Sequence, residues 1–507
     1  MKKTIYFTWF IAWCCITATT VVMTAQSPKR EFRGTWVHTV GNQQYKNMTT
    51  DQMQAHYLSL LDSFERAGIN VVIFQIRPQA DAFFISDIEP WSRFITGEQG
   101  RAPQPLWDPL QFMIEQCHAR GMELHAWLNP YRVTSSDTET LCADHLYYKK
   151  PYLFLKYGRQ IYFDPGHPES REHTLKVIAD VVKRYDLDAI HFDDYFYPYK
   201  IKYEEFPDEE SFMKYHAIDG FGRFDKNNWR RNNVNLLIKE LNHTIKEIKP
   251  WVKFGISPFG VWRNIADDPT GSNSRNMSNY DDLYADIKLW VEKGWIDYNV
   301  PQLYWEIGNP ISDYAVMEEW WSNNNFGQQL YIGQNIGSVL ITNRNQGSFE
   351  SQLHTKIEMG RNNPNVHGDV WWSGYSLTRN PNGLIDSLSD NYYKYPSLLP
   401  RYSYIDTVPP KPVGNLNVKR SGGETRLVWQ EPPATTEMDR AVRYCIYRFD
   451  PKEPVDLENA EKIVKVVGKN EYTLPAQKEN KEYLYVVTAL DRMWNESAPT
   501  KGIRIRH

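Results

Sequence analysis

"AIHFDDYFYP", residues 189–198, begins as an apolar strand and runs directly into two adjacent aspartates. Asp193 and Asp194 stand side by side at the point where a buried strand should end. Two neighbouring carboxylates in apolar surroundings repel each other, so folding alone gives no reason to place them together. Either one aspartate caps the next element, or the strand end opens into a solvated functional cleft.

Strand and helix signals alternate around this stretch, from about residue 33 to about residue 400. Thr49 to Gln52 has capping-box spacing, and Asp108-Pro109 is typical of a first helical turn. The predicted strands are 33–39, 70–76, 122–128, 188–194, 252–258, 297–305, 330–336 and 369–375. Eight strand–helix units predict an α/β fold of the (β/α)8 TIM-barrel type. An open doubly wound sheet is the alternative, but no Gly-rich phosphate loop follows any of these strands.

The character of the sequence changes near residue 400. A Pro-rich linker is predicted at 401–413, and short alternating strands without helical period follow at 414–507. We therefore divide the chain into a (β/α)8 barrel at 30–400, the linker, and a small all-β sandwich. The strand around Trp429 and the Tyr-x-Val-x-Ala-x-Asp run at 485–491 resemble a fibronectin type III domain. No chemistry is expected in this part of the chain.

Residues 1–25 are typical of a signal peptide, because a basic "MKK" start precedes an apolar stretch that ends in small residues at Ala25. We therefore expect export to the periplasm or the extracellular space. Cys14 and Cys15 leave a lipid anchor at the cell envelope open, although Trp13 stands where a small residue normally precedes a lipidated cysteine. No later apolar run is long enough to span a bilayer.

The composition favours one class of partner and disfavours others. A formal net charge of -4 without a basic block argues against nucleic acid and anionic membranes. The aromatic share of 14% leans towards a polysaccharide or oligosaccharide, because flat rings pack against the apolar faces of sugars. Cys117, Cys142 and Cys445 show no metal-type spacing, so no disulfide framework, zinc site or other cofactor is indicated. The sequence does not indicate an oligomeric state.

Functional residues of such barrels lie at the C-terminal ends of the strands and in the loops that follow them. Nearly every predicted strand end carries a hydrogen-bonding or aromatic side chain. The predicted substrate-binding residues are Trp36, His38, Gln75, Arg77, His125, Trp127, Asn129, Arg132, His191, Tyr195, Gln302, Tyr304, Trp371 and Trp372. The histidines are expected to bind substrate hydroxyls or to orient Asp193, since their spacing matches no zinc motif.

Alternation along a strand predicts which of these residues share a face. It places Asp193 and Glu306 in the lumen and turns Asp194 toward the barrel wall or a neighbouring loop, as a support for Asp193. Two carboxylates across a cleft are the minimum for glycoside hydrolysis, so Asp193, Glu306 and Asp194 are the predicted catalytic residues. A barrel that binds glycan without cleaving it, and a metal-dependent polysaccharide deacetylase built on "HFDD", remain as alternatives.

The sequence also predicts how the carboxylates divide the work. Arg77, Arg132 and His191 are expected near Asp193 and would hold it ionised, as a nucleophile or base requires. The aromatic neighbour of Glu306, Trp305, would raise the pKa of that carboxyl, as a general acid requires.

Seven ordered motifs resemble glycosyl-hydrolase-like family 10 proteins of the YngK type over about residues 31–395. They are "EFRGTWVHT", "FQIRPQADAFF", "ELHAWLNPYR", "YFDPGHPESR", "AIHFDDYFYP", "GISPFGVWRN" and "VPQLYWE". The resemblance implies a (β/α)8 barrel and glycosidase activity, with bacterial cell-wall glycan as an associated substrate class. "DAIHFDD" is also similar to the strand-four signature of chitinases, with Asp193 on its third Asp. His191 stands at the middle Asp and Tyr195 at the catalytic Glu, so the chitinase mechanism is not carried over.

Overall fold

The computed structural model describes residues 27–340, 349–476 and 481–506. The predicted signal peptide and its lipid-anchor alternative lie outside these ranges. None of the described helices combines the length and the apolar character that a membrane span requires.

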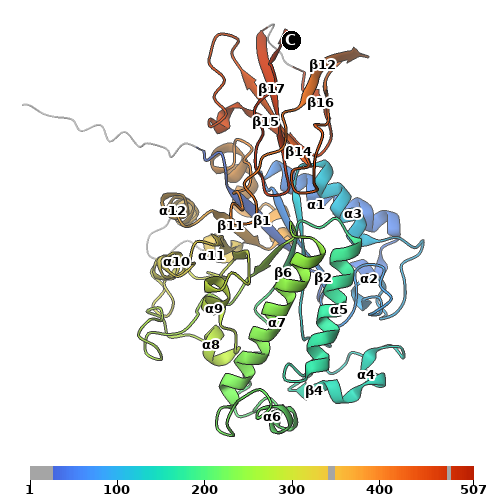
Figure 1. Ribbon diagram of the computed structural model, residues 1–507, viewed down its shortest axis with the longest axis vertical. Coiled ribbons are helices and arrows are strands. Elements are labelled where there is room, and N and C mark those ends of the chain that lie inside the picture. The colour runs from blue at the N-terminus through green and yellow to red at the C-terminus, as the bar shows by residue number, and fades with distance from the viewer. Residues whose placement is uncertain (1–26, 341–348, 477–480, 507) are drawn as a thin grey trace, which may run out of the picture.

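Parallel strands form a nearly closed barrel in the middle of the molecule (Figure 1). Their order in the sheet is β10-β11-β1-β2-β3-β6-β7-β8-β9. The strands are β1 (Phe32–Val37), β2 (Val71–Arg77), β3 (Glu123–Leu128), β6 (Ala189–Phe192), β7 (Lys253–Ile256), β8 (Tyr298–Asn299), β9 (Gln329–Leu330), β10 (Ile332–Asn335) and β11 (Gly368–Trp372). Only Tyr331 separates β9 from β10, and this one segment pairs with β8 on one side and with β11 on the other. The predicted (β/α)8 architecture is confirmed.

Helices cover the outside of the barrel between successive strands (Figure 1). The longer ones are α1 (Thr50–Arg66), α3 (Pro109–Ala119), α5 (Pro168–Arg184), α7 (Lys226–Ile248), α10 (Tyr314–Asn323) and α12 (Phe349–Asn362). Thr49 forms the predicted capping box with Gln52 at the start of α1. Asp108 caps α3 by accepting hydrogen bonds from the first helical N–H groups, with Pro109 in the first turn. Both helix starts predicted from the sequence are confirmed.

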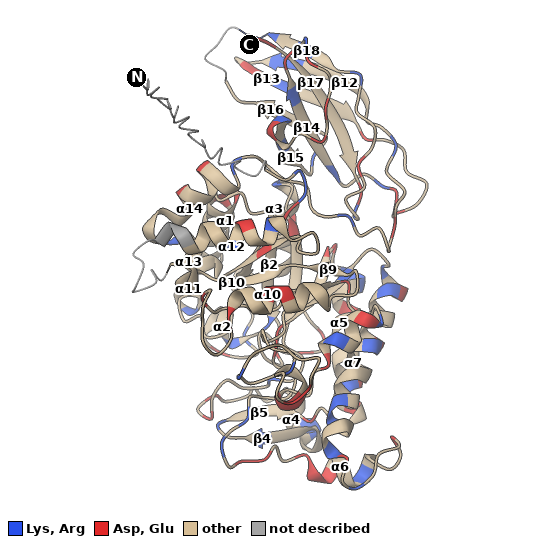
Figure 2. Ribbon diagram, turned by 90° about the vertical axis from the view of Figure 1, so that its left-hand side faces the viewer, with Lys and Arg blue, Asp and Glu red and all other residues tan. Residues whose placement is uncertain are grey.

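Two long connections extend from the barrel end at which the strands finish. The connection after β3 contains α4 (Leu146–Lys149) and a hairpin of β4 (Phe154–Tyr157) and β5 (Gln160–Phe163), and the connection after β6 contains α6 (Glu209–Tyr215). Figures 1 and 2 show these elements at the end of the molecule opposite the C-terminal strands. The hairpin was not expected from the sequence, because its strands are only four residues long each.

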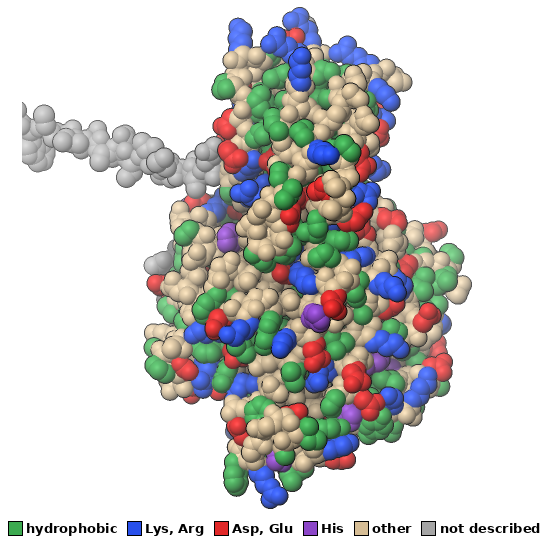
Figure 3. All heavy atoms as spheres, in the orientation of Figure 1, with side chains coloured by type: hydrophobic (Ala, Val, Ile, Leu, Met, Phe, Trp, Pro, Cys, Tyr) green, Lys and Arg blue, Asp and Glu red, His purple; other side chains and the backbone are tan. Residues whose placement is uncertain are grey.

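Two antiparallel sheets form the C-terminal part of the chain. One contains β12 (Gly414–Ser421), β13 (Glu424–Gln430) and β16 (Glu471–Leu474). The other contains β15 (Ile463–Val467), β14 (Arg443–Phe449), β17 (Glu482–Leu490) and β18 (Ile503–Arg506). Side chains of both sheets share one apolar core, so the predicted small all-β sandwich is confirmed. On the face in Figure 3, charges of both signs are interspersed over the barrel.

The sandwich packs against the N-terminal ends of the barrel strands. Arg443 of β14 forms a buried ion pair with Asp188, which directly precedes β6, at 2.8 Å. The Trp494 indole donates a hydrogen bond to Glu123, the first residue of β3, at 2.6 Å. An apolar cluster runs continuously from the barrel interior into the sandwich through Tyr402 and Trp494. The sandwich therefore covers the end of the barrel opposite the strand ends that carry functional groups.

Replacement of Arg443 by alanine should destabilise the full chain by about 3 to 5 kcal/mol, because it leaves the buried Asp188 carboxylate without its arginine. Arg426→Ala is the matched control in the same sandwich, since Arg426 pairs with glutamates at the surface and should cost less than about 1 kcal/mol. Urea unfolding of the two variants measures the difference. Equal costs would contradict a buried ion pair between barrel and sandwich.

Candidate active site

A pocket of about 520 Å³ opens at the C-terminal ends of the barrel strands. Strand ends or the residues just after them bring eleven of the predicted residues into its wall. They are Trp36, His38, Gln75, Trp127, Arg132, Asp193, Asp194, Tyr195, Gln302, Tyr304 and Trp372. The wall also includes residues that were not among the predicted site residues, namely Val40, Tyr199, Ser257, Phe259, Asn276 and Trp305. Ser257 and Trp305 stand in predicted strands, whereas the other four lie in connections where no periodic pattern marks them.

Asp193 is buried in the pocket wall directly after β6 and is held by donors from β3 and the residues that follow it. The Trp127 indole donates to Oδ2 at 3.1 Å, and the Asn129 amide donates to Oδ1 at 3.0 Å. The backbone N–H of Tyr195 contributes a longer bond to Oδ1 at 3.4 Å. Both carboxyl oxygens therefore have a fixed direction. Asn129 supports Asp193 and is not itself a pocket-lining residue.

Asp194 also lines the pocket, contrary to the expectation that it would turn toward the wall or a loop. The expectation extended strand alternation through residue 194, but β6 ends at Phe192. Beyond that point the backbone is no longer a strand and the period of two does not apply. Asp194 accepts a hydrogen bond from the Tyr199 hydroxyl and another from the Gln302 amide at 3.2 Å.

Burial sets the protonation of both carboxyls. It raises the pKa of Asp193 to about 7, an increase that Arg132 opposes and that neighbouring Asp194 reinforces. Burial likewise raises the pKa of Asp194, while the hydrogen bonds from Tyr199 and Gln302 act in the opposite direction. The expectation that Asp193 would be held firmly ionised is wrong, because desolvation outweighs its charged and hydrogen-bonding neighbours.

The arginine near Asp193 is Arg132 and not Arg77. Arg77 does not line the pocket but is buried, and it pairs with Glu89 at 2.6 Å. Arg132 lines the pocket and donates two hydrogen bonds to the carbonyl of Pro78. Its guanidinium also lies 5.4 Å from the centre of the Tyr195 ring. A single cation therefore faces Asp193 from the described wall of the pocket.

Glu306 does not line the pocket, although alternation predicted it in the lumen. β8 is only two residues long, and the chain after Asn299 is irregular, so alternation does not extend to residue 306. The Glu306 carbonyl accepts hydrogen bonds from the backbone N–H groups of Asn309 and Tyr314, which places it in the turn that leads to α10. The predicted pairing of Asp193 with Glu306 is not found, and the second carboxyl in the pocket is Asp194.

Three further predicted residues lie away from the pocket wall. His125 and His191 are fully buried deeper in the barrel, and each forms a hydrogen bond with the Tyr298 hydroxyl. Trp371 packs between the barrel and its helices, and its indole donates to the Tyr393 hydroxyl at 3.3 Å. The adjacent Trp372 reaches the pocket instead, because neighbouring residues of β11 face opposite sides of the sheet.

Aromatic rings form much of the pocket wall. The Trp372 ring lies 6.3 Å from Trp36 and 6.1 Å from Trp127, edge-on to both, and 5.2 Å from His38. Tyr195, Tyr199, Phe259, Tyr304 and Trp305 contribute further rings. Aromatic faces beside paired carboxyls suit a ligand that has both apolar faces and hydroxyl groups.

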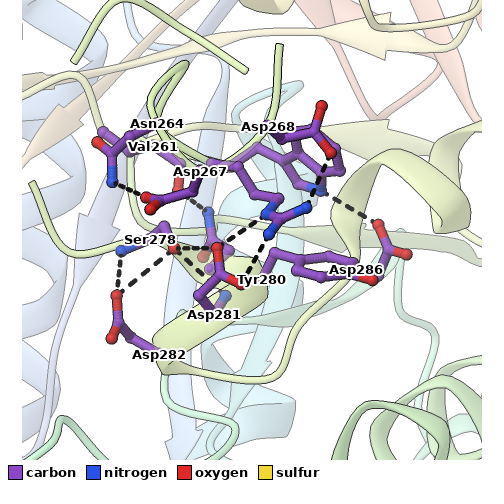
Figure 4. A network of polar contacts seen from close by, with 12 residues as sticks. Val261, Asn264, Asp267, Asp268, Ser278, Tyr280, Asp281, Asp282 and Asp286 are labelled. Atoms are coloured by element: carbon purple, nitrogen blue, oxygen red, sulfur yellow. Dashed lines mark hydrogen bonds and ion pairs between the residues drawn. The ribbon is translucent and has the colours of Figure 1, made fainter. Parts of the chain in front are cut away.

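The connection after β7 is held by a polar network that Figure 4 shows from close by. Arg263 donates to Asp281 and to Asp268, both at 2.8 Å, so the guanidinium compensates the cluster of aspartates in this loop. The Asn264 side chain bonds both backbone groups of Asn276, through its carbonyl at 3.0 Å and its amide at 2.9 Å. These bonds fix Asn276 in the pocket wall.

Comparison with known proteins gives consistent matches. A model of the family described as glycosyl hydrolase-like 10 matches residues 31–351. The chain is 42% identical over 480 residues to the glycosyl hydrolase YngK of Bacillus subtilis, which covers 93% of each protein. It is 38% identical over 332 residues to the glycosyl hydrolase DigH of Escherichia coli K12, which covers 61% of this chain and 74% of that protein. The solved PgaB glycoside hydrolase domain of Bordetella bronchiseptica is 11% identical, with a TM-score of 0.46, over 71% of this chain and 99% of that chain.

Replacement of Asp193 by asparagine should change how stability depends on pH. Because the pKa of Asp193 is raised in the folded protein, the protonated carboxyl contributes to the free energy of unfolding of wild type. This contribution is complete below about pH 4 and is lost as the pH rises through about 7. Asparagine does not titrate, so the variant does not lose this contribution. As the pH rises through this window, its free energy of unfolding should therefore increase relative to that of wild type by up to about 4 kcal/mol. Denaturant unfolding at several pH values measures the difference. Other buried carboxyls, such as Asp369, are common to both proteins and cancel. A difference that is constant with pH would contradict the raised pKa.

Proposed function

The chain belongs to the glycosyl hydrolase-like 10 family, and we propose that it hydrolyses O-glycosidic bonds of a polysaccharide in the pocket at the barrel mouth. The observation that carries the proposal is the pair of buried carboxyls, Asp193 and Asp194, in one aromatic-lined pocket. Glycoside hydrolysis needs one group that protonates the leaving oxygen and a second that attacks, activates water or stabilises the anomeric centre. Both carboxyls have the surroundings that such roles require.

Asp193 is assigned as the proton donor. Its pKa of about 7 means that a large fraction of the molecules carry the proton near neutral pH, and that the resulting carboxylate can take a proton back. The Trp127 and Asn129 bonds stabilise that carboxylate after the proton has left. This assignment replaces the one that the sequence suggested, in which Glu306 donated the proton.

Asp194 is assigned as the carboxylate that acts at the anomeric carbon, directly or through water. Tyr199 and Gln302 donate to it, and donors of this kind favour the ionised form against the effect of burial. Burial raises the pKa of Tyr199 far above its ordinary value, so that hydroxyl keeps its proton and remains a donor. Because the two aspartates are neighbours, the charge on Asp194 adds to the effect of burial and raises the pKa of Asp193.

The aromatic walls support a sugar polymer as substrate. Trp36, Trp127 and Trp372 surround one part of the pocket, while Phe259 and Trp305, 5.6 Å apart, belong to another. We propose bacterial cell-wall glycan as the substrate class, supported by the sequence motifs that resemble the YngK type. Export through the segment at 1–25 would bring the protein to that substrate. The C-terminal sandwich is proposed to be of the fibronectin type III kind and to stabilise the closed end of the barrel.

The deacetylase alternative is disfavoured by the side chains that would have to bind its metal ion. It requires a His/Asp metal set at "HFDD", but both ring nitrogens of His191 already have hydrogen-bond partners inside the barrel. Within the described ranges, no three His, Cys, Asp or Glu side chains are grouped so that they could hold a metal ion. The non-catalytic glycan-binding barrel is retained as an outcome of the experiment below.

Asp193→Asn and Asp194→Asn should separate the two roles. Asp193→Asn should lower hydrolysis of polymeric glycan by about 100-fold or more and lose far less on a glycoside with an activated leaving group, which needs little protonation. Asp194→Asn should lose activity on both substrates. Glu306→Gln is the matched control, because it removes a nearby carboxylate outside the pocket wall, and it should stay near the wild-type rate.

Product analysis by mass over a panel of polysaccharides, including peptidoglycan glycan strands, provides the measurement. The reverse pattern would exchange the roles of Asp193 and Asp194. Glycan binding by wild type without any product would establish the non-catalytic alternative. A large loss in Glu306→Gln would return that residue to the mechanism.

The pH dependence of hydrolysis should follow the proton on Asp193, so activity should fall as the pH rises through about 7. Trp127→Phe keeps an aromatic ring and removes one hydrogen bond that favours the ionised carboxylate. The pKa of Asp193 should therefore rise. The alkaline limb of the pH–activity profile, where activity is lost, should then move to higher pH by about one unit. Trp372→Phe is the control, because it changes a pocket tryptophan whose ring contacts Trp127. It should leave the alkaline limb at the same pH. Unchanged limbs in both variants would contradict Asp193 as the acid.

A further inference from the structure

A continuous chain of hydrogen bonds runs inside the barrel from its sandwich-covered end to the floor of the pocket. Glu123 Oε2 lies 2.8 Å from His125 Nε2, and His125 Nδ1 lies 2.8 Å from the Tyr298 hydroxyl. The Tyr298 hydroxyl lies 3.0 Å from His191 Nδ1. At the pocket end, His191 Nε2 lies 2.9 Å from the Ser257 hydroxyl. Glu123, His125, Tyr298 and His191 are fully buried, so the chain is shielded from bulk solvent.

The pocket end of the chain determines the protonation of His191. The Trp36 indole nitrogen lies 3.2 Å from His191 Nε2, and an indole N–H can only donate. His191 Nε2 is therefore the acceptor, and the ring proton is on Nδ1. The Nδ1–H group donates to the Tyr298 oxygen, which leaves the Tyr298 proton to point at His125 Nδ1.

The opposite end requires the same direction independently. Burial favours a proton on Glu123, but Lys253 and His125 outweigh it and lower the pKa of this carboxyl to about 2. Lys253 and the Trp494 indole both donate to Oε1, each at 2.6 Å. An ionised Glu123 can only accept, so His125 carries its proton on Nε2 and offers a bare Nδ1 to Tyr298. The two ends agree, and the two histidines hold opposite tautomers.

The barrel is shaped to hold the centre of this chain. In the sheet, Gly255 pairs with His191 on one side and with Tyr298 on the other. A Cβ at Gly255 would lie 1.9 Å from the Tyr298 ring, so only glycine leaves room for that ring in the lumen. The Tyr298 ring stacks on His191, with 5.8 Å between centroids and 21° between planes.

The far side of Ser257 connects this chain to the proposed reaction. Because His191 Nε2 has no proton, the Ser257 hydroxyl donates either to this nitrogen at 2.9 Å or to the Phe192 carbonyl at 3.3 Å. In both cases its proton is used inside the barrel, and its oxygen can only accept from the pocket side. The Gln302 amide donates both to the Ser257 carbonyl at 2.9 Å and to Asp194 at 3.2 Å. The position of Ser257 thus fixes Gln302, and through it the Asp194 carboxylate.

We propose that Tyr298 is a positioning residue, which passes the fixed hydrogen-bond direction from Glu123 to His191 and so orients Trp36 and Ser257 at the pocket floor. The inference rests on the proposed hydrolysis for its effect on rate. The expected consequence is that Ser257 recognises a substrate group that donates a hydrogen bond, such as a sugar hydroxyl.

Nitrogen-15 NMR of the histidine rings tests the chain in the full-length wild type without any substrate. His191 should show a protonated Nδ1 and a bare Nε2, and His125 should show the reverse. The signals are assigned by their loss in His191→Gln and His125→Gln. The same tautomer on both rings, or a protonated Nε2 on His191, would overturn the inference whether or not the protein proves to be a hydrolase.

Tyr298→Phe tests the positioning role, because it removes the central hydroxyl and keeps the ring. Tyr331→Phe is the matched control: Tyr331 is also buried in the barrel interior, but its hydroxyl bonds Tyr402 and not the chain. The His191 nitrogen signals should shift only in Tyr298→Phe. Its kcat/KM on the activated glycoside should fall roughly tenfold to hundredfold below that of Tyr331→Phe, as expected when reacting groups are misplaced.

Equal rates in the two variants, or equal losses, would overturn the positioning role. If wild type shows no turnover on any glycan, the proposed function fails, and glycan affinity replaces the rate as readout. Affinity that is equally unchanged in both variants would then overturn the role of Tyr298. If Tyr298→Phe does not fold, the wild-type tautomers still decide whether the ordered chain exists.

Discussion

The hydrogen-bonded chain inside the barrel depends on the pairing of the ionised Glu123 carboxylate, which is fully buried at the closed end of the barrel. A buried charge is tolerated only when it is paired and hydrogen-bonded. Lys253 supplies the counter-charge from β7, His125 supplies a donor from β3, and Trp494 supplies one from the sandwich. The sandwich is therefore part of the electrostatic design of the barrel, which explains why polar contacts as well as apolar surface join the two.

The two ends of the lumen treat carboxylates in opposite ways. Glu123 meets a buried lysine and remains ionised, while Asp193 and Asp194 are held mainly by neutral donors, with Arg132 as the nearby cation, and their pKa values rise. The pairing of Glu123 with lysine stabilises the closed end and fixes the direction of the hydrogen-bonded chain. At the other end, the raised pKa of Asp193 leaves this carboxyl with a proton that can be exchanged near neutral pH, as the proposed acid–base catalysis requires. Because the ordered chain lies between them, the stable end can fix the groups that surround the reactive end.

The sequence predicted the barrel and much of its mouth, because alternating strand and helix signals and the strand-end rule depend on local patterns. It failed where the strands are shorter than their apolar runs. β6 ends at Phe192 and β8 at Asn299, so alternation assigned the wrong environments to Asp194 and Glu306. Arg77 was misassigned for another reason: its partner Glu89 lies in a loop, and sequence spacing does not show which buried ions pair. Tyr199 and Asn276 reach the pocket from connections whose paths depend on tertiary contacts.

The departures from the chitinase-like signature also have a physical explanation. His191, at the position of the middle Asp, is a neutral link in the ordered chain, and burial lowers its pKa well below the ordinary value. A carboxylate there would need protons from both Tyr298 and Trp36 and would leave the Tyr298 proton unavailable to His125. Tyr195, at the position of the catalytic Glu, has its pKa raised by burial and by the neighbouring aspartates, so its hydroxyl does not serve as a base near neutral pH. In the proposed mechanism the acid–base roles at this strand end therefore fall to Asp193 and Asp194, and those roles would account for two carboxylates side by side at the end of a strand.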